Sequence, residues 1–131
     1  MQLFFFHLYL TKYILIEVGE KMELVIIVLN KTDLLDELLT EFMNNDLSGA
    51  TVLDSSGMGH LISNQFPMFS MFAELDDEKE NNSKTILKVV RSIEERERTE
   101  ELVEKIIGDF KDPDTAIMIS LPVSSAKGIN Y

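Results

Sequence analysis

One apolar segment constrains the fold of this chain more than any other feature. Residues 24–29 read Leu-Val-Ile-Ile-Val-Leu without a polar interruption, although 27% of the chain is charged. A run of this length that is rich in β-branched residues is typical of a strand buried on both faces. The sequence therefore predicts a central strand in a sheet that needs cover on both sides.

Two helical patterns alternate with three further strand patterns. The first helix is expected to begin at an N-cap on Thr32 or Asp33, and the second follows Ser92, whose spacing to Glu95 predicts a capping box. Apolar residues recur at helical spacing in both: Leu34, Leu35, Leu38, Leu39, Phe42 and Met43, then Leu102, Val103, Ile106, Ile107 and Phe110. The remaining strands are expected at residues 50–53, 84–91 and 115–121.

This order of elements predicts an α+β fold, the ferredoxin-like βαββαβ plait. Two βαβ units with right-handed crossovers give a four-stranded antiparallel sheet with both helices on one face. A long insert separates strands 2 and 3. The third strand carries apolar residues on both of its faces, with Leu87 on one and Ile86 and Lys88 on the other. We therefore expect the face without helices to be buried in an oligomer.

The composition of the chain excludes several classes of function. A chain of 131 residues is expected to be one domain, and its net charge of −11 argues against binding the phosphates of nucleic acids. The absence of cysteine excludes disulfides and thiolate metal sites, and it fits a reducing cytoplasm. The histidines are His7 and His60, so neither a His-rich metal cluster nor a Ser–His pair is expected, and we predict no enzymatic activity.

Residues 1–21 are predicted to be an N-terminal extension outside the core domain, which is expected to span residues 22–131. The apolar residues of this extension are interrupted by His7, Thr11 and Lys12 and fall short of the roughly 20 residues that a membrane helix needs. A signal peptide would have a basic start and a small-residue cleavage site, and neither is visible. Our hypothesis is that Met22 is the true start, and a membrane-surface anchor is the alternative. Peptides from residues 1–21 in the native protein would contradict the hypothesis.

A loop rich in serine and glycine follows the second strand. Gly57 and Gly59 permit close approach of the backbone, so the amides of this loop are candidates for binding an anion. An ordinary turn is the alternative.

The rest of the insert has two parts. The first is rich in aromatic residues and methionine, including Phe66, Met68, Phe69 and Phe72, and the second is polar and spans residues 76–82. Adaptable Met and Phe surfaces suit the binding of a protein partner. The alternative is that these side chains pack over an open end of the sheet.

The strand and its loop together resemble the PII signalling protein family. The resemblance lies in the pattern Gly49-x-Thr51-Val52-x-Asp54 followed by Gly57-x-Gly59-His60, and again in residues 119–123, Ile-Ser-Leu-Pro-Val. It covers roughly residues 22–123 and implies a homotrimer that binds a nucleotide in clefts between subunits and signals through the long T-loop. By position, it implies ligand contacts at Thr51, Val52, Gly57, Met58, Gly59 and His60.

The cations with which this family binds phosphate are missing here. Asp114-Thr115-Ala116-Ile117 replaces the family's Gly-Asp-Gly-Lys turn, and Lys127 is the one basic residue after the Pro-Val exit. A triphosphate brings about four negative charges, which a protein at −11 without those cations cannot balance. We therefore expect a small adenine nucleotide, such as AMP or a cyclic nucleotide, with Lys88 and Arg91 as further contacts, in place of ATP and 2-oxoglutarate.

The expected partners are further copies of this chain, in a homotrimer, and a target protein, for which a membrane transporter is one candidate. The main alternative is an interaction module of the same fold that binds no ligand and uses the Phe66–Phe72 segment as its contact. A metal-responsive trimer is a third hypothesis, which the shortage of histidines disfavours.

Overall fold

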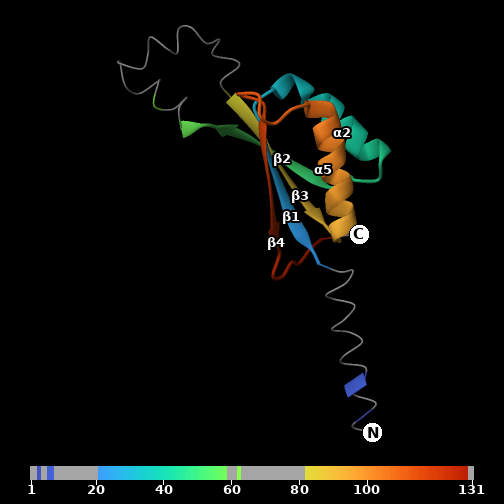
Figure 1. Cartoon of the computed structure of the whole chain (residues 1–131). Coiled ribbons are helices and arrows are strands. Elements are labelled where there is room, and N and C mark those ends of the chain that lie inside the picture. The colour runs from blue at the N-terminus through green and yellow to red at the C-terminus, as the bar shows by residue number, and fades with distance from the viewer. Residues whose placement is uncertain (1–2, 4–5, 8–20, 59–61, 63–81, 130–131) are drawn as a thin grey trace.

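The computed structural model describes residues 3, 6–7, 21–58, 62 and 82–129. In order, its elements are β1 (Glu23–Leu29), the 3-10 turn η1 (Thr32–Leu34), α2 (Leu35–Asn44), β2 (Ala50–Ser56), β3 (Asn82–Val90), α5 (Ile93–Ile107) and β4 (Ala116–Pro122). The strands form one sheet in the order β2-β3-β1-β4, and all neighbours are antiparallel. Both helices lie on the same side of the sheet (Figure 1). The predicted ferredoxin-like α+β fold is confirmed.

The strand register divides the sheet into two faces. Ile27 lies opposite Ile86 on one neighbouring strand and opposite Met118 on the other, and all three belong to the helix side. The adjacent residue of β1, Ile26, lies opposite Leu87 and Ile119 on the other side, which we call the open face. Because side chains alternate along a strand, every second residue belongs to the open face.

The hydrophobic core lies between the helices and the sheet. Each large aliphatic or aromatic side chain buried here contributes about 1.5–3 kcal/mol relative to leaving it in water. The cluster of buried residues consists of Val25, Ile27, Leu29, Leu38, Phe42, Leu47, Ile86, Val90, Val103, Ile107 and Ala116. The open-face residues of β1 are only half-buried in the single chain. The predicted central strand is therefore covered on one face.

The start of α2 differs from the prediction. Neither Thr32 nor Asp33 caps the helix with its side chain, because both lie in the 3-10 turn that precedes it. Backbone hydrogen bonds from Asn30 N and Lys31 N to Thr115 O, at 3.0 and 3.3 Å, tie the preceding residues to the start of β4. The polypeptide then turns through η1, and the helix begins only at Leu35.

The start of α5 agrees closely with the predicted capping box. Ser92 Oγ accepts a hydrogen bond from Glu95 N at 3.1 Å. The Glu95 carboxylate reaches back as expected, but it accepts from Arg91 N at 2.9 Å, so it also holds the end of β3. The helix ends at Ile107, where Gly108 takes a positive φ of 88° that favours glycine.

Candidate functional site on the open face of the sheet

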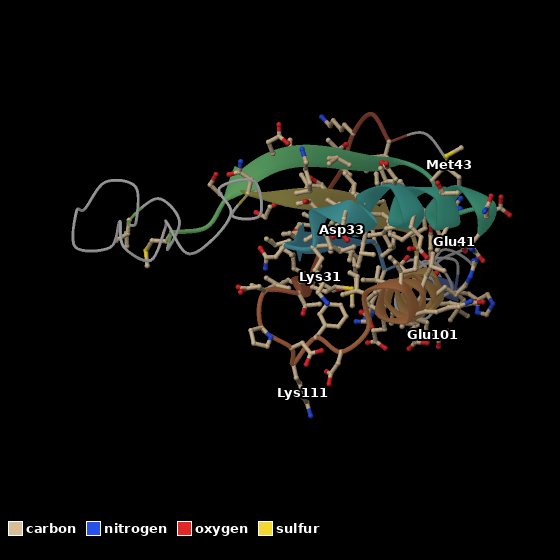
Figure 2. The ribbon with its side chains drawn as sticks, turned by 90° about the horizontal axis from the view of Figure 1, so that it is seen from above. Lys31, Asp33, Glu41, Met43, Glu101 and Lys111 are labelled. Atoms are coloured by element: carbon tan, nitrogen blue, oxygen red, sulfur yellow. The ribbon has the colours of Figure 1, made fainter. Side chains whose placement is uncertain are left out.

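The open face contains no ionisable residue on any of its four strands. The register assigns to it Leu24, Ile26, Val28, Thr51, Leu53, Ser55, Ser83, Thr85, Leu87, Val89, Ile117, Ile119 and Leu121. The charged side chains labelled in Figure 2 come instead from the helices and the turns beside them: Lys31, Asp33, Glu41, Glu101 and Lys111. A chain with a net charge of −11 thus has one neutral and largely apolar surface.

Several large apolar side chains of this face are exposed to solvent. Ile117, Ile119 and Leu121 of the edge strand β4 are 55%, 50% and 39% exposed. Leu53, on the opposite edge strand, is 46% exposed. A contiguous apolar surface of this kind marks a site of interaction in soluble proteins.

A cluster of three hydroxyl groups interrupts the apolar surface where β2 ends and β3 begins. Ser55 Oγ lies 2.6 Å from Ser83 Oγ, and Thr85 Oγ1 donates to Ser55 Oγ at 2.8 Å. Ser83 is buried, with 4% of its surface exposed. We call Ser55, Ser83 and Thr85 the hydroxyl cluster. The hydroxyl cluster was not predicted from the sequence, although polar residues at matching positions of two neighbouring strands are a signal that could have revealed it.

Three of the predicted ligand contacts lie on or beside this surface. Thr51 is exposed on the open face, two same-face positions before Ser55. Gly57 and Met58 follow directly after β2 and are exposed. Gly57 does not have a positive φ, and a Cβ added to it would meet nothing within 4 Å. Its expected role in a tight anion-binding loop is therefore not visible in its own backbone.

The other predicted ligand residues are dispersed. Val52 pairs with Ile86 on the helix side. Arg91 follows the far end of β3, where its Nε lies 3.4 Å from Glu95 Oε2. Gly59 and His60 lie outside the described residues, as do Phe66, Met68, Phe69 and Phe72 of the predicted partner surface.

Lys88 is placed in the core, on the face opposite Thr51. Its side chain is 1% exposed and donates through Nζ to Ser48 O at 3.1 Å. The ammonium lies 5.9 Å from the centre of the Phe42 ring, within the range of a cation–π contact. Burial lowers the pKa of Lys88 below its usual 10.5, with a further lowering by Arg91 and an opposing effect of Glu95. The structure thus separates Lys88 from the open-face residues.

Two polar hollows lie on the described surface, and one of them includes Ser55 of the hydroxyl cluster. One, of about 380 Å³, is lined by Asp54, Ser55, Ser56, Asn82 and Lys84 at the end of the β2–β3 ribbon. Its lysine forms an ion pair with Asp54. The other, of about 240 Å³, lies between the end of α2 and the middle of α5, where Arg98 donates to Asn45 O at 2.8 Å. In both, a cation is already bound to an acceptor of the same chain.

Metal and membrane features are absent from the described part of the chain. No group of three or more His, Cys, Asp or Glu side chains there is arranged to hold a metal ion. Within the same residues, no helix has the length and apolar character to cross a membrane.

Comparison with known proteins supports the fold. No protein-family model and no curated protein matches the chain. Among solved structures, the chain is similar to the crystal structure of a functionally unknown protein from Pediococcus pentosaceus ATCC 25745, with 17% identity and a TM-score of 0.54. The match covers 84% of this chain and 99% of that one. At this identity the likeness shows the shared ferredoxin-like architecture alone.

Proposed function

We propose that this chain is a non-enzymatic, PII-like signalling protein that assembles as a homotrimer in the cytoplasm. It would bind a small adenine nucleotide in clefts between subunits and pass the signal to a target protein through residues 57–82. The observation that carries this proposal is the open face, which is apolar, partly exposed and free of ionisable residues.

The neutrality of the open face favours association between copies of the chain. At a net charge of −11, two copies repel each other wherever their charged surfaces meet. Contact through the open face brings together surfaces without like charges, and it buries Ile117, Ile119 and Leu121 of β4. This contact would supply the cover that the apolar run of β1 lacks in the single chain.

The position of Thr51 supports a ligand site at the border of such an interface. Thr51 is exposed on the edge strand β2, which leads directly to Gly57 and Met58. The strand residues of this face include no cation, so a nucleotide with few charges fits it better than a triphosphate. This agrees with the missing phosphate-binding cations in the sequence.

The interaction module without a ligand remains the second candidate, and the backbone of Gly57 favours it. That glycine has neither a positive φ nor a close neighbour, so nothing in its local structure requires glycine. In this candidate, the Phe66–Phe72 segment would bind the target protein, and a nucleotide would have no role.

A thermal-shift comparison distinguishes the two candidates. A ligand at about 100 times its dissociation constant adds roughly 2.7 kcal/mol to stability, which gives a readable rise in melting temperature. We expect AMP or a cyclic nucleotide to stabilise the protein, and Gly59→Val to remove the shift while the trimer persists. No shift with any adenine nucleotide would contradict the sensor. Binding of a target that depends only on Phe69 and Phe72 would then support the interaction module.

A further inference from the structure

The hydroxyl cluster has one more hydrogen-bond donor than it uses. Its three hydroxyl groups carry three hydrogens, and the two hydrogen bonds within the cluster take up two of them. Among the described residues, the side chains of Ser55, Ser83 and Thr85 make no further hydrogen bond. Whichever way the Ser55–Ser83 bond is directed, one hydrogen remains without an acceptor.

An unmet donor at this position is costly. Ser83 is 4% exposed, so water has limited access to its hydroxyl, whereas Ser55 is partly exposed and lines a hollow of about 380 Å³. Buried polar hydrogens in native proteins are nearly always paired, and one that lacks a partner destabilises the folded state. The cluster is thus prepared for an acceptor oxygen from outside the described residues.

The surroundings of the cluster limit the kind of acceptor. The strand residues of the open face include neither a carboxylate nor a cation, so a highly charged anion is not balanced there. Asp54 and Lys84 line the same hollow as Ser55, and their charges are paired with each other. Thr51 lies four residues before Ser55 on the same face, about 13 Å away at the rise of a strand. The exposed side chain of Leu53 lies between them and offers an apolar contact.

We propose that the hydroxyl cluster donates its spare hydrogen bond to a phosphate oxygen of a nucleoside monophosphate that lies along β2 on the open face. The base lies toward Thr51, and the sugar passes over Leu53. This inference rests on the proposed function and adds to it the group that recognises the phosphate. A hydroxyl that donates to a phosphate oxygen forms a charge-assisted hydrogen bond, which is stronger than one between neutral groups.

The test compares AMP with adenosine, which lacks only the phosphate, by calorimetric titration of the full chain. The wild-type protein is compared with the triple variant Ser55→Ala, Ser83→Ala, Thr85→Val, in which every hydroxyl of the cluster is removed. Ser56→Ala is the matched control, because Ser56 lies on the same strand but on the helix side, where its hydroxyl bonds Asn82.

We expect the wild-type protein and the Ser56→Ala control to bind AMP about tenfold more tightly than adenosine. A tenfold ratio corresponds to about 1.4 kcal/mol, which is near the low end of the contribution of one hydrogen bond to a charged group. The triple variant should bind AMP only as tightly as adenosine, with adenosine affinity unchanged.

Three results would overturn the inference and leave the nucleotide sensor standing. These are equal affinity of the wild-type protein for AMP and adenosine, an unchanged AMP preference in the triple variant, and a loss in that variant that is equal for both ligands. Equal affinity of the wild-type protein for AMP and adenosine is measured without any variant, so this result tests the inference even if the triple variant fails to fold. If the wild-type protein binds neither ligand, this inference fails, and the nucleotide part of the proposed function fails with it only if no cyclic nucleotide gives a thermal shift.

Discussion

Lys88 is a charged side chain in the core beneath both helices. Lys88 is almost completely shielded from water. Its ammonium donates a hydrogen bond to Ser48 O and lies over the face of the Phe42 ring. Ser48 belongs to the connection between α2 and β2, so the lysine ties this connection to the middle of the sheet. A buried charge of this kind destabilises the folded state wherever its protonated form must be kept.

The burial of Lys88 should be measurable in the pH dependence of the free energy of unfolding. Burial lowers its pKa from 10.5, so between the lowered value and 10.5 the unfolded chain binds more protons than the folded one. Stability from this group therefore rises with pH across that window, by about 1.4 kcal/mol for each unit by which the pKa is lowered. We expect the wild-type protein to gain stability relative to Lys88→Met as pH rises toward 10.5 in urea unfolding.

The exposed Lys111 provides the control substitution, Lys111→Met. A difference between the wild-type protein and Lys88→Met that stays constant from neutral pH to 10.5 would contradict the burial of a protonated lysine.

The sequence correctly predicted the position of a residue where a single local rule, such as the alternation of side chains along a strand, determines it. The alternation of β3 correctly separated Leu87 from Ile86 and Lys88, because the period of a strand fixes its faces. The burial of Lys88 was not predicted, because it depends on Phe42 and Ser48, which approach the lysine only when α2 packs on the sheet. The hydroxyl cluster was missed for the same reason, since it needs the register of β2 on β3.

At the scale of elements, α5 shows how a few residues fix where a helix begins. Ser92 Oγ accepts from Glu95 N, while Glu95 Oε2 accepts from Arg91 N, so the first turn and the end of β3 are joined. The buried residues Thr99, Val103 and Ile107 then follow at intervals of four along one side. The position of the cap therefore determines which side of the helix faces the sheet.

Removing the cap should destabilise the protein measurably. We expect Ser92→Ala to lower the free energy of unfolding by about 1 kcal/mol, since Glu95 N loses its acceptor. Urea unfolding at one fixed protein concentration measures this difference. Ser124→Ala, an exposed serine after β4, is the matched control. If both variants lose the same stability, Ser92 does not act as a cap.

The order and type of the elements were predictable, but their ends were less so. Amphipathic spacing and the strand–helix alternation were enough for the fold. The 3-10 turn before α2 was not anticipated, because it depends on backbone hydrogen bonds to Thr115, more than eighty residues away along the chain. β2 and β3 also extend further toward the insert than expected, to Ser56 and from Asn82.

At the scale of the whole molecule, the chain distributes charge and apolar surface unequally. The charged side chains labelled in Figure 2 belong to the helices and turns, and Asp54, Lys84 and Lys88 lie on the helix side of the strands. The strand residues of the open face include no charged side chain. The helices cover the apolar run of β1 on one side of the sheet only, and its open-face residues are half-buried in the single chain (Figure 1). In the proposed homotrimer, other copies of the chain bury the open face.

The mass of the full chain in solution, measured by light scattering after size-exclusion chromatography, tests this claim most directly. We expect a mass of three chains of 15.0 kDa each. Ile119→Lys, which places a charge in the middle of the open face, should give a single chain, because burying an unpaired charge costs several kcal/mol. Met43→Lys, a matched change at a 71% exposed position of α2, should leave the assembly intact. A wild-type protein with the mass of one chain, or an Ile119→Lys variant that still assembles, would contradict the account.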